Sequence, residues 1–143
     1  MAASKTYLVP VDFSKGSEIA LKQAIKMAKE NRGKLLLVHV ISTALAFPLE
    51  VGFTDIFEIL EKGAREGFKK LVRRMRLKTG QYRSILVRGE DTAWVIANQA
   101  KKSRAAMIIM GSHGKRGLQR LMLGSVAERT LRYAECPVLI VKK

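Results

Sequence analysis

The sequence predicts an α/β protein, built on a mostly parallel sheet with helices on both faces. Short apolar runs alternate with longer amphipathic segments along the chain, and this alternation implies right-handed crossovers between parallel strands. The run LLLVHVI, residues 35–41, is nearly continuous in apolar side chains. Such a run is typical of a strand buried on both faces. These observations predict one domain over residues 1–143.

Strands and helices are expected in strict alternation. The strands are expected at residues 7–11, 35–41, 84–87, 107–110 and 137–141. The helices are expected at residues 14–31, 55–77, 92–103 and 126–134, and residues 42–53 are expected to form a loop. In the first helix, apolar residues recur at the i, i+3, i+4, i+7 spacing of a single face. Ser14 or Ser17 can cap this helix, and Gly33 can end it.

Composition limits the class of protein. No stretch approaches the roughly 18 consecutive apolar residues of a membrane helix, and Asp12 interrupts the apolar start that a signal peptide would need. The single cysteine, Cys136, leaves no internal disulfide to form. We therefore expect a cytoplasmic protein with no membrane segment. Cys136 itself is expected to be structural.

The chain is strongly basic, with 27 Lys and Arg against 12 Asp and Glu and a net charge of +15. Two interpretations remain open. The charges lie along helix faces, which favours an ordinary solvated surface. An excess of this size also attracts polyanions such as nucleic acid, although no aromatic–basic stacking pattern accompanies it.

A glycine-rich stretch, GSHGKRGLQRLMLGS, follows the fourth expected strand. Gly111 and Gly114 come directly after the strand, and Gly124 and Ser125 come directly before a helix. Glycine permits positive φ and close backbone approach, and a helix start presents unsatisfied N–H groups to an anion. Ser125 would cap the helix or donate its hydroxyl to a phosphate. The two common phosphate motifs are absent, so an ordinary glycine-rich turn remains the alternative.

The spacing G-x-x-G, nine residues, G-S resembles the ATP-binding branch of the universal stress protein family. The opening YLVPVDFSKGSEIAL is similar to the family's first strand and helix, and LLLVHVI to its second strand. The segment IIMGSHGKRGLQRLMLGSVAERTLRYAECPVLIVK is similar to its C-terminal signature. The resemblance is weakest over residues 43–80. It implies a flavodoxin-like (Rossmann-like) open parallel five-stranded sheet of order 3-2-1-4-5, and a homodimer that pairs its last strands, here Val138–Val141.

The resemblance also implies a site for ATP, or for ADP or AMP, with Mg²⁺ or Mn²⁺. Asp12 would lie beside the ribose or a metal-bound water, so its contact with the metal would be indirect; capping the next helix is its alternative role. Val40 would contact adenine through its backbone, and Met110 would pack near the base or sugar. The residues implied are Pro10, Asp12, Val40, Met110, Gly111, His113, Gly114, Gly124, Ser125 and Val126.

Structural roles compete at several of these positions. Val40 and Met110 also suit a strand core, and the side chain of His113 suits a solvated loop. His39 is expected to be a satisfied strand histidine and Trp94 a packing residue. A solvated loop is also expected for the spacer cations Lys115, Arg116 and Arg120.

Three functional hypotheses follow. The first is an ATP-binding regulator of stress response or signalling that acts on an unidentified protein partner, with weak or no hydrolysis. The second is a slow metal-dependent ATPase that uses Asp12. The third is a basic module that binds polyanions or nucleic acid.

Overall fold

The computed structural model describes residues 4–46, 53–113 and 122–142. Within these residues, strands and helices alternate in the order that the sequence predicts. The strands are β1 (Thr6–Pro10), β2 (Lys34–Ser42), β3 (Tyr82–Gly89), β4 (Met107–Gly111) and β5 (Val138–Val141). The helices are α1 (Lys15–Asn31), α2 (Phe53–Arg74), α3 (Thr92–Ser103) and α4 (Ser125–Tyr133), with a short 3₁₀ helix, η1, at Thr43–Ala46.

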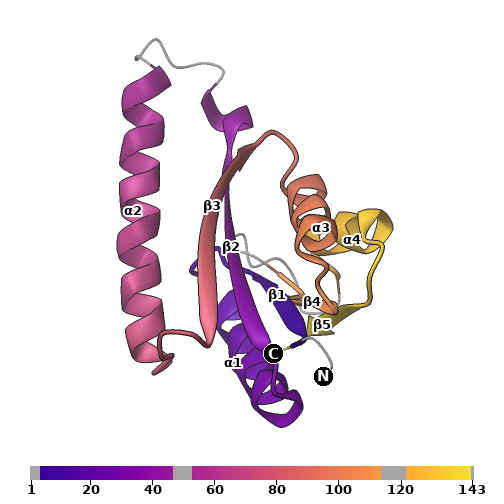
Figure 1. The fold of residues 1–143 in the computed structure, drawn as a ribbon. Coiled ribbons are helices and arrows are strands. Elements are labelled where there is room, and N and C mark those ends of the chain that lie inside the picture. The colour runs from indigo at the N-terminus through magenta and orange to yellow at the C-terminus, as the bar shows by residue number, and fades with distance from the viewer. Residues whose placement is uncertain (1–3, 47–52, 114–121, 143) are drawn as a thin grey trace.

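The five strands form one parallel sheet of order β3-β2-β1-β4-β5, as the family resemblance implied (Figure 1). Two apolar cores lie on its two faces. One contains Val9, Leu37 and Leu21 of α1 together with Leu71 of α2. The other contains Leu8 and Leu36 with residues of α3 and α4. Because alternate residues of β1 and β2 enter opposite cores, the central strands are apolar along most of their length.

Hydrogen bonds at the helix ends set most of the boundaries. The hydroxyl of Ser14 accepts a bond from the N–H of Ser17 at 3.3 Å and caps α1. Arg32 adopts a left-handed conformation (φ 53°) after α1, and the N–H of Gly33 then donates to the carbonyl of Ala28 at 2.8 Å. The sequence therefore indicated both ends of this helix.

Several predicted boundaries were wrong. The third strand was expected at the apolar residues 84–87. The observed β3 spans Tyr82–Gly89, because all of these residues pair with β2. Helix α2 ends at Arg74 instead of residue 77, because the chain turns at Arg76 with φ 56°. Part of the expected loop forms η1. Trp94 was expected to pack, but its side chain is 54% exposed on α3.

No helix in the described part of the chain is both long enough and apolar enough to span a membrane.

Candidate functional site

The predicted site residues lie at the carboxyl ends of three neighbouring strands. Pro10 ends β1, Val40 lies near the end of β2, and Met110 and Gly111 end β4. The sheet order places β1 between β2 and β4, so these ends are adjacent. Ligands of open parallel sheets bind beyond the carboxyl ends of strands, where the strand order reverses. Here the reversal falls between β1 and β4.

Asp12 is held in place at the start of α1. Its Oδ1 atom accepts a hydrogen bond from the backbone N–H of Ser14 at 3.0 Å and another from the hydroxyl of Ser14. Ser14 in turn caps the helix. The sequence left open whether Asp12 or Ser14 caps α1; Ser14 does so, and Asp12 orients the cap. A carboxylate is therefore fixed where β1 meets the positive end of the α1 dipole.

Three glycines allow α1, β4 and the start of α4 to meet backbone to backbone. A Cβ atom on Gly111 would lie 2.8 Å from the carbonyl oxygen of Gly16, and one on Gly16 would overlap the carbonyl oxygen of His113. A Cβ on Gly124 would lie 2.8 Å from the carbonyl oxygen of Ser112. The N–H of Gly124 donates to that same oxygen at 2.7 Å. No side chain fits at these three positions without displacing backbone.

Sequence reasoning missed Gly16. The glycine motif lies between a strand and a helix, whereas Gly16 lies in the first turn of α1, two residues after its cap. A glycine inside a helix is costly, because it loses more conformational freedom on folding than other residues. A glycine at this position of the predicted helix therefore indicated that another backbone segment approaches α1 closely there.

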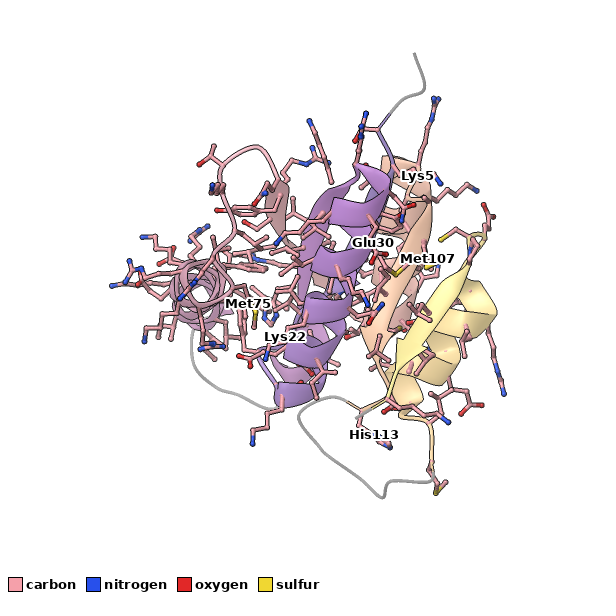
Figure 2. The ribbon with its side chains drawn as sticks, turned by 90° about the horizontal axis from the view of Figure 1, so that it is seen from below. Lys5, Lys22, Glu30, Met75, Met107 and His113 are labelled. Carbon is pink, nitrogen blue, oxygen red and sulfur yellow. The ribbon has the colours of Figure 1, made fainter. Side chains whose placement is uncertain are left out.

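His113 is half-buried instead of solvated. Its Nδ1 lies 3.1 Å from the hydroxyl of Ser112. Its Nε2 is buried and has no hydrogen-bond partner among the residues that the structure describes. A buried ring nitrogen normally finds a partner, so this atom is suited to a polar group of a ligand or of the neighbouring loop. Figure 2 shows His113 at the end of the molecule where α1 begins.

At the start of α4, Gly124 is the N-cap and Ser125 is the first helical residue. Of the two roles that the sequence left open for Ser125, the cap is not formed, since the helix start has no side-chain cap bond. Ser125 and Val126 are both exposed. The first N–H groups of α4 and the Ser125 hydroxyl are therefore accessible to an anion.

Val40 and Met110 contribute to the core that faces α3 and α4. Met110 is buried, and Val40 packs against the same cluster while remaining half-buried. Both therefore have the strand-core role that the sequence left open, and Val40 keeps a partly exposed surface near the strand end.

A cluster of rings stabilises the loop that carries Asp12. Phe13 has a left-handed backbone (φ 64°), and its ring contacts His39 and Phe68 at centroid distances of 4.9 and 5.3 Å. His39 Nδ1 lies 2.7 Å from the carbonyl oxygen of Val11, so this strand histidine is satisfied, as predicted. Gly67 of α2 leaves room for the Phe13 ring.

Cys136 lies apart from the candidate site. It packs at the edge of the second core, where burial raises the pKa of its thiol. A neutral thiol of this kind suits the structural role expected from the sequence.

Some predicted residues cannot be placed. Gly114 and the spacer cations Lys115, Arg116 and Arg120 lie outside the described residues. Within the described ranges 4–46, 53–113 and 122–142, no group of three His, Cys, Asp or Glu side chains could hold a metal ion. A single carboxylate such as Asp12 suits Mg²⁺, which commonly binds through one carboxylate together with waters and the phosphates of a ligand.

The parallel five-stranded sheet and its order define a flavodoxin-like α/β protein, with the candidate site at the β1–β4 end. The model of the universal stress protein family matches residues 4–142. The chain therefore belongs to the universal stress protein family.

Similar proteins support this assignment over nearly the whole chain. Universal stress protein MJ0531 of Methanocaldococcus jannaschii is 37% identical over 145 residues, covering 97% of this chain and 82% of its own. Universal stress protein YxiE of Bacillus subtilis is 35% identical over 144 residues, which cover 94% of this chain and 97% of that protein. The solved structure of the protein MJ0577 superposes with a TM-score of 0.86 at 30% identity, over 99% of this chain and 98% of that one.

A more distant relative has the same fold. The universal stress protein of Archaeoglobus fulgidus, solved in complex with dAMP, has a TM-score of 0.69 at 22% identity and matches 99% of this chain and all of its own.

Proposed function

We propose that this protein binds an adenine nucleotide beyond the carboxyl ends of β1 and β4, and that it acts in the cytoplasm as a nucleotide-dependent regulator. The observation that carries the proposal is the backbone junction of Gly16, Gly111 and Gly124. It holds the first turn of α1 and the N-cap of α4 against the same segment, residues 111–113 at the end of β4. Helix N-termini with accessible N–H groups are suited to phosphates.

The individual side chains fit this role. The Ser125 hydroxyl would donate to a phosphate oxygen, and the partly exposed surface of Val40 would meet the base. Asp12 would face the ribose or a water on Mg²⁺ or Mn²⁺; the metal, when bound, neutralises phosphate charge. ATP is the nucleotide that the family motif favours, with ADP and AMP as smaller alternatives. The dAMP complex of the Archaeoglobus fulgidus protein is a precedent for a nucleotide on this fold.

The site lacks much of what efficient hydrolysis requires. Asp12 is an acceptor for Ser14, which suits a positioning role, and the motif places no second acidic residue near the phosphates. We therefore infer weak turnover or none, with the bound nucleotide biasing a surface that a protein partner recognises.

Replacing Gly124 with valine tests the site. The new side chain would displace the Ser112 carbonyl and the start of α4, so ATP binding measured by calorimetry should disappear. Gly63→Val is the matched control, because a Cβ at Gly63 meets nothing within 4 Å. Gly63→Val should bind ATP as the unmodified protein does.

Ser125→Ala separates loss of binding from loss of folding. It leaves the backbone intact and removes one hydrogen bond to a charged group, so affinity should fall by about tenfold. Unchanged affinity in both Gly124→Val and Ser125→Ala would show that the nucleotide binds elsewhere.

We also propose that β5 pairs with β5 of a second copy to make a homodimer. β5 is an edge strand whose four residues, Val138–Val141, are all apolar and only half-buried. An apolar edge without charges favours pairing with another strand.

A further inference from the structure

The amino-terminal end of the sheet, opposite the candidate nucleotide site, carries a concentration of positive charge. In a parallel sheet with crossover helices, the strand starts and the helix C-termini lie at this same end. We call the exposed cations found there the basic end: Lys5, Lys29, Arg32, Lys34, Arg73, Arg76, Lys78, Arg83, Lys101, Lys102 and Arg104. Glu30 and Glu135 are the acidic residues within it. Figure 2 shows Lys5 and Glu30 at one end of the molecule and His113 at the other.

Hydrogen bonds join the segments of the basic end into one surface. The N–H of Ala106, just after α3, donates to the carbonyl of Thr6 at 2.8 Å, and the N–H of Lys34 donates to the carbonyl of Lys5 at 2.7 Å. The N–H of Leu35 donates to the carbonyl of Gln81 at 3.0 Å, which connects β2 to the segment after α2. The cations are therefore neighbours across the sheet.

Most of this charge has no ion-pair partner among the described residues. The ion pair that the described part of the chain contains within the basic end is Lys101 with Glu135. Residues 67–89 contain eight Lys and Arg and no acidic residue, and Lys69, Arg74 and Arg88 are the members of this segment that pair with described glutamates outside it. Favourable interaction with a helix dipole explains a cation in the last turn of a helix. It does not explain Lys5, Lys34 and Arg83, which lie at the starts of strands.

The basic end is also hollowed. A cavity of about 290 Å³ lies between the end of α1 and the segment that joins α2 to β3. Lys29, Arg32 and Lys34 line its rim together with Ser4 and Gln81, and the apolar side chains of Ile25, Ala28, Leu35 and Leu77 line the rest. Cations from two elements therefore converge on a concave surface, where their fields add.

The remaining composition of the basic end indicates the kind of partner. Most of the large hydrophobic side chains that the described structure exposes lie elsewhere, on α2, on α3, just before α4 and at its start; Leu131 and Tyr133 are exposed in the last turn of α4. A protein interface normally has an apolar core, and a membrane-bound surface normally inserts apolar side chains. Stacking of single-stranded bases needs exposed aromatic rings, but Tyr7 is buried, Tyr82 is half-buried, and the hydroxyl of the exposed Tyr133 is hydrogen-bonded to Arg129 and Asp91. This composition favours contact with phosphates.

We propose that the basic end binds the backbone of double-stranded nucleic acid without reading its sequence. Lys and Arg contacts to phosphates carry no sequence information and depend steeply on salt, because each contact releases condensed counterions. This activity uses the face opposite the nucleotide site, so both ligands can bind at once. It is independent of the proposed nucleotide binding.

Fluorescence anisotropy of a 20-base-pair DNA duplex, titrated with protein between 50 and 200 mM NaCl at saturating ATP, tests the proposal. The variant Lys34→Gln/Lys78→Gln removes two exposed cations of the basic end that make no ion pair among the described residues. Its affinity should fall at least tenfold at 50 mM salt. The slope of log K against log salt should become shallower by about 1.8, at about 0.9 per lost phosphate contact.

Lys62→Gln/Lys142→Gln is the matched control, since it removes the same charge from exposed positions outside the basic end. It should lose less than threefold in affinity. Equal losses in the two variants, or no binding at 50 mM salt, would overturn the proposal. Displacement of the duplex by polyglutamate at equal charge concentration would also overturn it, in favour of an acidic protein partner.

Discussion

At the residue scale, three segments can pack backbone to backbone because glycine has no side chain. The glycines concerned are Gly16, Gly111 and Gly124. Gly111 and Gly124 could be predicted, because they border a strand and a helix in a spaced motif. Gly16 could not be found from that motif, since its neighbour in space, His113, is far away in sequence. Asp12 was named as a site residue, but its bond to Ser14 required the structure. Local sequence indicates which residues are special, whereas the geometry of their contacts, both local as at Asp12 and long-range as at Gly16, comes from the structure.

Replacing Gly16 with alanine tests this junction. The new methyl group would overlap the carbonyl oxygen of His113, so β4 and α1 must move apart. We expect a loss of about 1–3 kcal/mol in the free energy of unfolding, the usual range for overpacking, and a clear loss of ATP affinity. Urea denaturation and calorimetry measure the two effects.

Gly63→Ala is the control for the intrinsic effect of the substitution. Gly63 lies inside α2 with open space around it, so alanine there should stabilise the protein by about 0.5–1 kcal/mol. A Gly16→Ala protein that is stabilised in the same way would contradict the junction.

At the scale of elements, hydrogen bonds at the helix ends connect α3 to α4. Asp91 caps α3 by accepting from the N–H of Trp94 at 3.3 Å, and its carboxylate also pairs with Arg129 of α4. The guanidinium of Arg129 donates a hydrogen bond to the hydroxyl of Tyr133. This bond and the nearby carboxylate of Asp91 raise the pKa of Arg129. The sequence predicted the limits of α3 without error, but not this connection, because Asp91 and Arg129 are 38 residues apart.

Two substitutions at Asp91 separate the cap from the ion pair. Asp91→Ala removes both and should lower the free energy of unfolding by about 1 kcal/mol, the typical value of an N-cap. Asp91→Asn keeps the cap and removes the charge, and an exposed ion pair contributes little, so it should resemble the unmodified protein. Thermal or urea unfolding distinguishes them; equal losses would show that the ion pair matters more than the cap.

The free edge of β5 makes the homodimer testable. The N–H of Ile108 donates to the carbonyl of Pro137 at 2.9 Å, so alternation along the strand turns the N–H groups of Val138 and Ile140 away from β4. Ile140→Pro removes one outward donor and should give a monomer in light scattering. Ile140→Ala loses a similar side chain but keeps the donor, and should remain a dimer. A dimeric Ile140→Pro protein would contradict pairing through β5.

At the scale of the whole molecule, the alternation of elements predicted the α/β class, whereas the strand order came from the family resemblance. Periodicity does not state which strands are neighbours, and the β3-β2-β1-β4-β5 order depends on packing between distant segments. The net charge was visible in the sequence, but its concentration at one end of the sheet was not. The fold places the two proposed binding surfaces apart: the glycine junction at one end, and the basic end at the other.

The central claim is that the glycine junction binds an adenine nucleotide. Isothermal titration of ATP, ADP and AMP, each with Mg²⁺, into protein freed of bound nucleotide tests it most directly. We expect at least one of the three to bind with one nucleotide per chain, and this binding to disappear in Gly124→Val while Gly63→Val retains it. Absence of binding for all three nucleotides at millimolar concentration, in a folded protein, would contradict the account.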